Sequence, residues 1–548
     1  MKVVIVGGVA GGMSTATRLR RRDESAQIVV LERGEHVSFA NCGLPYYVGG
    51  VIEERQALLL QTPQSLAARF RIDVRTRHEV VDIDRENRTV RVRDLSTGTE
   101  SLENYDSLIL SPGASPFVPD FPGAEQALRL RDIADVDRMT AAVAGHPRTA
   151  LVMGAGFIGV EMAENLVERG IKVTLVEMAD QVLAPLDPEM AVLVHHRLTE
   201  RGVDVHLGSR VTAFSDGMAT LSSGQDVPAD LLVAAIGVRA ESGLAVRAGL
   251  EVNERGGIVV DDRQRTSDPH IYAVGDAAQK RDFVDGGAAM VPLAQTANRH
   301  GRLVADVITG RETHAQPVLG TAIVGVFGLQ VAATGWNEKR LRAAGRRFRA
   351  IHTHPADHAG YYPGAQGMSL KLLVDPETDA ILGAQGVGAA GVDKRIDVIA
   401  TAMRGQIAAS ELADLELAYA PQFGSAKDPV NMLGFVADNL ASGMTEAVQW
   451  HELDAMVAAG AHVLDVRTPG EYAAGAIPGA VLIPVDELRD RLDEVPEGDL
   501  IVHCAVGLRG HIAVQILGRH GRAVRHLDGG YRTWRAGQDA LSVRVAHR

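Results

Sequence analysis

The sequence predicts an α/β protein built on parallel β-sheets, because one local pattern occurs in it twice. An aliphatic run at residues 3–6 enters a glycine-rich turn and then a helix-forming segment at residues 13–22, and residues 149–153 do the same. Continuous aliphatic runs are typical of strands that a parallel sheet buries on both faces, with helices covering those faces. The repetition therefore predicts two domains of strand–turn–helix construction.

The first glycine turn predicts a dinucleotide site. It contains Gly7 and Gly12, although Val9 takes the place of its middle glycine, and the next strand, at residues 27–31, leads into Glu32. A helix N-terminus attracts a pyrophosphate, and a carboxylate about 20 residues beyond the turn can bind a ribose hydroxyl. We therefore expect Gly7, Gly12 and Glu32 to bind a cofactor.

The second turn is a complete fingerprint. Gly154, Gly156 and Gly159 precede a helix at residues 160–169, and a strand at residues 173–176 leads into Glu177. Two dinucleotide sites in one chain indicate a flavin enzyme that a nicotinamide cofactor reduces. Because no arginine follows Glu177 closely, the site suits a free ribose hydroxyl, and we expect NADH rather than NADPH.

Length and charge exclude several classes of protein. A chain of 548 residues should form about three or four domains. Its net charge of -13 argues against a nucleic-acid binder. The aliphatic run at the N-terminus is too short for a signal peptide, and no apolar stretch is long enough to span a bilayer. We expect a soluble, cytoplasmic protein with no membrane partner.

Two cysteines, Cys42 and Cys504, occur in the whole chain, each beside glycine and polar residues. They are too few for a disulfide framework. Such isolated thiols fit reactive centres, while the alternative for Cys42 is a small buried apolar side chain.

The order of the motifs resembles the pyridine nucleotide–disulfide oxidoreductases over residues 1–440, including the segment 266–276 that ends in Asp276. The resemblance implies an FAD-binding domain at residues 1–112 and 240–318, an NAD(P)H-binding domain at 113–239 and an α+β dimerisation domain at 319–440. The first two would be Rossmann-like, joined by crossing strands at 108–114 and 234–237. It also implies FAD contacts at Arg33, Asp276 and Ala294.

The segment at residues 38–46 is closely similar to the active-site segment of coenzyme A–disulfide reductases and of NADH-dependent persulfide and polysulfide reductases. Many relatives pair two cysteines separated by four residues, but the second position here is Tyr47. The resemblance implies that Cys42 reacts with an external thiol, or with oxygen as a sulfenic acid. Ala10 replaces a histidine usual in the peroxidases and oxidases, which favours the thiol.

Two further segments, 358–364 and 418–421, resemble those whose tyrosines reach this active site from the partner subunit of a homodimer. The resemblance implies that Tyr361, rather than Tyr362, and Tyr419 assist a leaving thiolate as general acids. It also implies that coenzyme A, as substrate or as a tightly held mixed-disulfide partner, contacts Ser14, Arg18, Arg21, Ser38, Asn41, Arg71, Asn298 and Lys427.

Residues 445–548 resemble an α/β rhodanese domain, on the motifs at 462–469, 475–480, 504–509 and 527–531. A strand at 500–503 would lead to Cys504, whose loop would stabilise a persulfide, with Arg509 contacting an anion. Four residues separate Cys504 from Arg509, the spacing of sulfurtransferases rather than phosphatases. Gly510 replaces a hydroxyl residue, so we expect thiosulfate to be a poor donor. An inactive binding module is the alternative.

Together these features predict an FAD-dependent NADH oxidoreductase that reduces coenzyme A persulfide or polysulfide at Cys42, while Cys504 handles sulfane sulfur. Three alternatives stay open. They are a coenzyme A–disulfide reductase proper, an NADH oxidase or peroxidase acting through Cys42 sulfenic acid, and a non-catalytic redox sensor.

Overall fold

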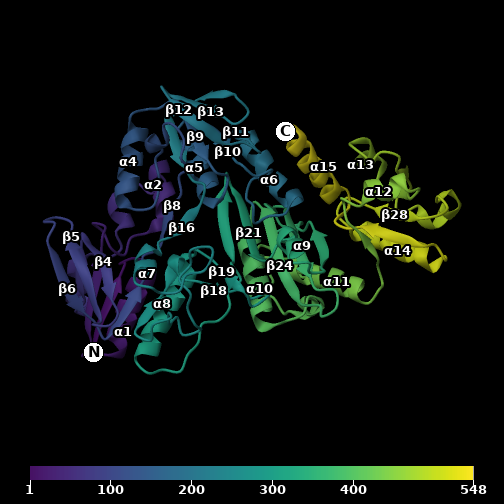
Figure 1. Cartoon of the computed structure of the whole chain (residues 1–548). Helices are drawn as coiled ribbons and strands as arrows, with labels where there is room; N and C mark the ends of the chain where they lie inside the picture. Colours follow the sequence, from purple (N-terminus) through teal and green to yellow (C-terminus); the bar gives the residue numbers. More distant parts are fainter. Residues whose placement is uncertain (547–548) are drawn as a thin grey trace. The chain divides into compact units, whose positions relative to one another are not determined.

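The computed structural model describes residues 1–546, which form two compact units. The first contains Met1–Val176 and Arg210–Gly320, and the second contains Glu177–Ser209 and the chain from Thr321 onward (Figure 1). The structure thus groups residues 177–209 with the later part of the chain. The limits of the four domains expected from the sequence remain predictions. No helix in the described residues is long and apolar enough to cross a membrane.

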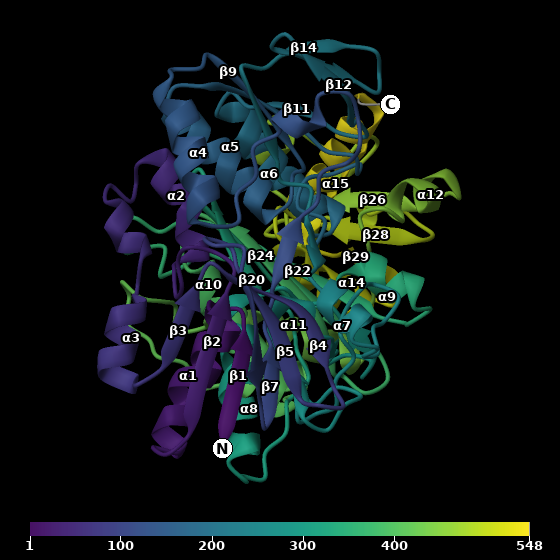
Figure 2. The same ribbon diagram turned by 60° about the vertical axis from the view of Figure 1, so that its left-hand side comes forward.

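The first unit contains a five-stranded parallel sheet in the order β17-β7-β1-β2-β3. Its strands are β1 (Lys2–Val6), β2 (Gln27–Glu32), β3 (Asp73–Thr76), β7 (Ser107–Leu110) and β17 (Ile271–Ala273). Figure 2 shows β1, β2 and β7 side by side near the N-terminus. Helices α1 (Ala10–Arg22) and α8 (Ala294–Ile308) pack against each other. The strands expected at residues 3–6 and 27–31 are present.

A second parallel sheet in this unit contains β10 (Lys172–Val176), β9 (Thr149–Met153) and β15 (Leu231–Ala234). Helix α5 (Phe157–Glu168) follows β9 in the sequence. The expected crossing strands lie a few residues further on. Residues 108–110 and 231–234 belong to the sheets, and the crossing pair is β8 (Ala114–Pro116) with β16 (Val238–Ala240). Gly113 and Gly237, at φ +75° and +101°, turn the chain between sheet and crossing strand.

The remaining elements of the first unit are short helices and antiparallel ribbons. They are α2 (Leu44–Gly49), α3 (Pro63–Phe70), β4 (His78–Asp84), β5 (Thr89–Asp94), β6 (Glu100–Asn104), α4 (Ile133–Ala144), β12 (Val211–Ser215), β13 (Met218–Leu221), β14 (Asp226–Pro228), α7 (Gly243–Arg247), β18 (Lys280–Arg281) and β19 (Ala288–Ala289).

The second unit contains a five-stranded antiparallel sheet in the order β20-β21-β24-β23-β22. The strands are β20 (Ala322–Val326), β21 (Leu329–Gly335), β22 (Arg349–Thr353), β23 (Met368–Val374) and β24 (Ile381–Gly388), and the helices of this region are α6 (Pro188–Glu200), α9 (Glu338–Ala343), α10 (Val392–Gly405) and α11 (Pro429–Ala441), with β11 (Asp204–His206) after α6. Every residue of β23 and β24 is buried. This agrees with the α+β region expected from the sequence.

The same unit ends in a five-stranded parallel sheet, β25-β29-β28-β26-β27, drawn in yellow-green to yellow in Figure 1. Its elements are β25 (Ala447–Val448), α12 (Leu453–Ala458), β26 (His462–Asp465), α13 (Pro469–Ala473), β27 (Val481–Leu482), β28 (Leu500–His503), α14 (Leu508–Arg519), β29 (Val524–Leu527) and α15 (Gly530–Ala546). Helix α15 packs on α6. The expected strand before Cys504 is β28.

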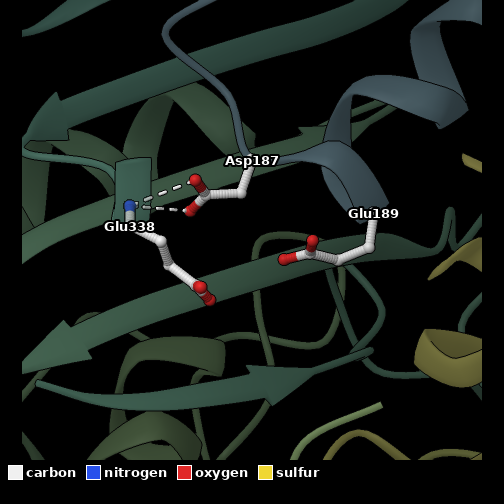
Figure 3. A group of neighbouring side chains, drawn as sticks. All are labelled: Asp187, Glu189 and Glu338. Atoms are coloured by element: carbon white, nitrogen blue, oxygen red, sulfur yellow. Dashed lines mark hydrogen bonds between the residues drawn. The ribbon is translucent and has the colours of Figure 1, made fainter. Parts of the chain in front are cut away.

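A buried ionic cluster connects separate parts of the second unit. The Lys371 ammonium on β23 lies 2.5 Å from a Glu189 oxygen, 2.6 Å from Glu338 and 3.0 Å from Asp187. Figure 3 shows these three carboxylates converging from α6, its N-terminal flank and α9. A buried charge is tolerated only when it is paired and hydrogen-bonded. Lys371 therefore supplies the positive charge that lets three acidic side chains meet here.

We expect Lys371→Met to destabilise the second unit by about 3–5 kcal/mol, because it leaves buried carboxylates without their cation. Thermal unfolding of the full chain, followed by calorimetry, measures the change. Arg347→Met is the control, since both side chains of the Arg347–Glu377 ion pair are exposed, at 78% and 72%. An exposed ion pair contributes little to stability. Equal shifts in the two variants would contradict a special role for Lys371.

Candidate active site

The first glycine turn is shaped for a dinucleotide. Gly7 has φ +98°, and a Cβ atom on it would lie 2.1 Å from the Ser111 carbonyl oxygen. A Cβ on Gly12 would lie 1.9 Å from the carbonyl oxygen of Gly7. Among the described residues, no side chain caps the N-terminus of α1 at Val9. The backbone amides of this first turn are therefore available to an anion such as the pyrophosphate of FAD.

Glu32 follows the turn in a fixed position. Its two carboxylate oxygens accept hydrogen bonds from the backbone amides of Gly8 and Gly34, each at 2.7 Å. A carboxylate oxygen can accept more than one hydrogen bond, so Glu32 can still accept one from a ribose hydroxyl. Arg33 pairs with Glu241 at 3.3 Å. The position of the Glu32 carboxylate therefore fits the ribose of FAD.

Two other predicted FAD residues lie elsewhere in the first unit. Asp276 lies in a short 3₁₀ turn, Gly275–Ala277, where burial raises the pKa of its carboxyl group. Lys280 donates hydrogen bonds to the Gly275 and Ala278 carbonyls at 2.5 and 2.8 Å, and burial lowers its pKa to about 8. Ala294 is the first residue of α8. Sequence reasoning missed Lys280, which holds the backbone of this turn.

The second glycine turn has the same construction. Gly154 has φ +97°, a Cβ on it would lie 2.6 Å from the Ala235 carbonyl oxygen, and a Cβ on Gly159 would lie 1.8 Å from that of Gly154. Gly156 precedes α5 in open space and has no side chain to cap the helix. Glu177 directly follows β10, and its carboxylate accepts from the Ala179 amide at 2.8 Å. The arrangement fits a nicotinamide dinucleotide.

Cys42 lies in a 3₁₀ turn, Asn41–Gly43, immediately before α2, and it is exposed. Partial burial of its sulfur raises the thiol pKa, and the Glu161 and Asp276 carboxylates raise it further. Tyr46, one helical turn later, donates its hydroxyl to Glu161 at 3.0 Å. Glu161 was missed by sequence reasoning, although it follows Gly159 by two positions on α5. Its charge opposes formation of the Cys42 thiolate.

The residues expected to contact coenzyme A are only partly brought together. Ser14 donates its hydroxyl to Asn298 at 2.7 Å, because α1 and α8 lie side by side. Arg18 makes two hydrogen bonds to Asp306 on α8, at 2.8 and 3.2 Å. Asp306 also lies 3.7 Å from Arg22 and 3.2 Å from Arg311, so three arginines share its one negative charge, whereas Arg21 is exposed. No local sequence pattern indicates these pairings.

Three other predicted contacts lie in the loops of the first unit. Ser38 and Arg71 adopt left-handed backbone conformations, at φ +50° and +49°. Arg71 ends α3, and its carbonyl accepts a hydrogen bond at 2.9 Å from the buried Arg20. Asn41 donates its side-chain amide to the Arg131 carbonyl at 3.3 Å.

The two predicted tyrosines meet in the second unit. The hydroxyls of Tyr361 and Tyr419 are 2.8 Å apart, and both rings are exposed. Their loops are joined because the Ala359 amide donates to the Gly424 carbonyl at 3.0 Å. The hydrogen bond between the two hydroxyls raises the pKa of Tyr361. Lys427 is exposed and precedes the N-terminal cap of α11.

Cys504 directly follows β28 and is completely buried. Its sulfur accepts a hydrogen bond from the Gly507 amide at 3.1 Å, and Gly507 has φ +117°, a backbone conformation that favours glycine. An amide directed at sulfur stabilises a thiolate or persulfide anion. Helix α14 begins at the next residue.

Arg509 has an acidic partner that sequence reasoning missed. Its guanidinium makes two hydrogen bonds to Glu471, at 2.6 and 2.7 Å, and it lowers the pKa of Glu471 to about 2. The expected anion contact is therefore balanced by a carboxylate. At Gly510, a Cβ would lie 2.6 Å from Nε2 of the buried His526, so the hydroxyl residue usual there would not fit.

We expect Glu161→Gln to lower the pKa of Cys42, because it removes a negative charge that disfavours the thiolate. In a Cys504→Ser background, the midpoint of the rate of alkylation against pH should shift downwards. Glu168→Gln is the matched control, since Glu168 is exposed at the C-terminal end of the same helix. An unshifted midpoint in the Glu161 variant would refute this role.

We expect Glu471→Gln to improve thiosulfate as a sulfur donor several-fold, because it leaves the Arg509 charge unbalanced for an anionic donor. Steady-state transfer from thiosulfate to cyanide measures the effect. Arg509→Gln should lower that rate. If both variants lost activity equally, the Arg509–Glu471 pair would be needed only to hold the loop.

The comparisons with known proteins agree with this layout. Residues 1–301 match the pyridine nucleotide-disulphide oxidoreductase family, residues 321–429 match its dimerisation domain, and residues 449–537 match the rhodanese-like domain. A coenzyme A disulfide reductase of Staphylococcus aureus is 35% identical over 438 residues, which cover 80% of this chain and 99% of that protein.

Two solved structures cover nearly the whole chain. Reduced Bacillus anthracis CoADR-RHD is 48% identical, with a TM-score of 0.97 over 99% of this chain and 98% of that one. An NAD-dependent persulfide reductase from A. fulgidus is 38% identical, with a TM-score of 0.91 over 97% of this chain and 100% of that one. The chain belongs to the pyridine nucleotide-disulphide oxidoreductase family, and it carries a C-terminal rhodanese-like domain.

Proposed function

We propose that this chain is an FAD-dependent NADH oxidoreductase that reduces coenzyme A persulfide or polysulfide and releases hydrosulfide. One observation carries the proposal: a single chain holds two unpaired thiols of different character. Cys42 is exposed next to the first dinucleotide fold, and Cys504 is buried with an amide directed at its sulfur. The persulfide reductase that is 38% identical supports the same substrate class.

The reaction at Cys42 balances as two steps. The thiolate attacks the inner sulfur of coenzyme A persulfide, so that a Cys42–coenzyme A mixed disulfide forms and hydrosulfide leaves. Bound FAD would pass two electrons from NADH to this disulfide. With the hydrogen that NADH gives up together with its two electrons, the reduction yields the coenzyme A thiol and restores the Cys42 thiolate. Each turnover therefore consumes one NADH and one persulfide and releases one hydrosulfide and one coenzyme A thiol.

Tyr361 and Tyr419 are proposed to supply or hold the proton for the leaving sulfur. Their mutual hydrogen bond raises the pKa of Tyr361, so its hydroxyl stays protonated at neutral pH, as a general acid must. The dimerisation-domain match supports a homodimer. The tyrosines are proposed to act across its interface.

The remaining contacts define the binding partners. Ser14, Arg18, Arg21, Ser38, Asn41, Arg71, Asn298 and Lys427 are the proposed contacts of coenzyme A. The fixed Glu177 carboxylate supports NADH over NADPH, because it would repel a 2′-phosphate. Two free thiols support a reducing, cytoplasmic setting.

A second candidate is reduction of coenzyme A disulfide, which needs the same residues and has a different leaving group. The Staphylococcus aureus relative favours it. Steady-state NADH oxidation with coenzyme A persulfide, coenzyme A disulfide, polysulfide, peroxide and oxygen distinguishes the candidates. Faster turnover with oxygen or peroxide than with every sulfur substrate would refute the proposal. Absence of turnover with any substrate would favour a redox sensor.

We expect Cys42→Ser to lower NADH-dependent persulfide reduction by at least roughly a hundredfold, because the attacking sulfur is gone. Cys504→Ser should leave the rate with free coenzyme A persulfide nearly unchanged. Hydrosulfide release and NADH oxidation are measured together. Equal loss in both variants with this substrate would make Cys504 an obligatory participant and contradict the division of labour.

A further inference from the structure

We propose that His352, on β22, is a positioning residue for Cys504. It acts through Asp528 and the two-glycine turn that follows Asp528, which together support the backbone of the Cys504 loop. The inference rests on the proposed function of Cys504 as a carrier of sulfane sulfur. Three successive sets of contacts support it.

The first contacts join His352 to Asp528. The His352 amide donates to one Asp528 carboxylate oxygen at 3.1 Å, and the imidazole Nδ1 donates to the other at 2.6 Å. The second ring nitrogen, Nε2, donates to Glu189 at 3.0 Å. Burial alone would lower the pKa of His352, but the two carboxylates raise it to about 9. The ring is therefore a buried imidazolium bridging α6 to the turn after β29.

The second contacts lie in the glycine turn. Gly529 and Gly530 both have φ +64°, a left-handed conformation that side chains disfavour. A Cβ on Gly529 would lie 2.8 Å from the Cβ of His352, and a Cβ on Gly530 would lie 2.5 Å from the Cys504 carbonyl oxygen. The turn is thus packed between His352 on one side and Cys504 on the other, with no room for a side chain.

The third contacts reach the sulfur loop itself. The Tyr531 amide donates to the Cys504 carbonyl at 2.8 Å, and the Arg532 amide donates to the Ala505 carbonyl at 3.0 Å. These bonds hold the backbone that directs the Gly507 amide at the Cys504 sulfur. A shift of Asp528 would therefore move the groups that set the geometry around the sulfur.

His352 is itself held rigidly. Glu189 is fixed by Lys371 at 2.5 Å, within the buried ionic cluster of Figure 3. His354, two residues along the chain, bonds Thr533 at 2.8 Å and supports the same turn. A fixed donor on the antiparallel sheet therefore determines the position of the turn, and through it the Cys504 loop.

Two substitutions separate the two contacts of the ring. The side-chain nitrogen of asparagine falls near the position of Nδ1, and that of glutamine falls near Nε2. Both remove the charge equally. His352→Asn therefore retains a donor toward Asp528, whereas His352→Gln retains one toward Glu189. Asp528→Asn removes the accepting carboxylate from the other side and leaves His352 in place.

The readout is hydrogen–deuterium exchange of the backbone amides at residues 504–509, compared with exchange in β26, because a general loss of stability would raise both. This measurement needs no access of a reagent to the buried sulfur. We expect exchange at residues 504–509 alone to rise in His352→Gln and in Asp528→Asn, and to stay near the parent value in His352→Asn. With both cysteines present, His352→Gln should slow sulfur transfer at Cys504 by roughly tenfold and leave Cys42-dependent reduction of free persulfide unchanged.

Gln449→Ala is the matched control. Gln449 donates to the Ala350 carbonyl at 3.1 Å, so it joins the same strand to the C-terminal region without touching the glycine turn. Equal changes in exchange with asparagine and glutamine, no change in any variant, or a change with Gln449→Ala as large as with His352→Gln would each overturn the proposal. If Cys504 transferred no sulfur in the parent chain, its proposed function would fail, whereas amide exchange at residues 504–509 would still decide the role of His352.

Discussion

Backbone amides at the start of helices are the interaction on which each functional loop of this protein depends. In three places a buried parallel strand, β1, β9 or β28, ends in a glycine-containing turn and a helix begins directly behind it. The amides of a first helical turn have no partner within the helix, and they carry partial positive charge. The same construction suits two pyrophosphates and, at Cys504, a sulfur anion. Gly7 and Gly154 pack closely against neighbouring backbone, and Gly507 at φ +117° has a backbone conformation that favours glycine.

Several charged side chains near these loops and in the interior have partners of opposite sign. Arg18 is paired with Asp306 and Arg509 with Glu471. In the interior, Lys371 and His352 neutralise carboxylates from helices and loops distant in sequence. These pairings hold the charged side chains in set directions. Complementary charge at set positions is what gives specificity for an anionic ligand.

The sequence predicted the parts of the fold that local pattern determines. The strand–turn–helix units and the parallel sheets needed only periodicity and glycine spacing, whereas the position of β28 followed from the resemblance to rhodanese domains. Boundaries were less exact, since α5 begins at Phe157 and not at residue 160. The pairings of Arg18 with Asp306 and of His352 with Asp528 join residues 288 and 176 positions apart. No local signal specifies such partners, because tertiary packing alone brings them together.

Gly510 departs from the rhodanese motif, and the structure gives a physical reason for the departure. The sequence shows only that a hydroxyl residue is missing, and the structure shows His526 in the space that its side chain would need. The structure likewise explains why Cys42 and Cys504 differ. The groups around each sulfur, rather than the sequence motif, determine its chemistry. Carboxylates near Cys42 disfavour its thiolate, whereas an amide at Cys504 stabilises an anion on sulfur. A stabilised sulfur anion suits a carrier, whereas the Cys42 thiolate, which its carboxylate neighbours disfavour, is the more reactive nucleophile once it forms.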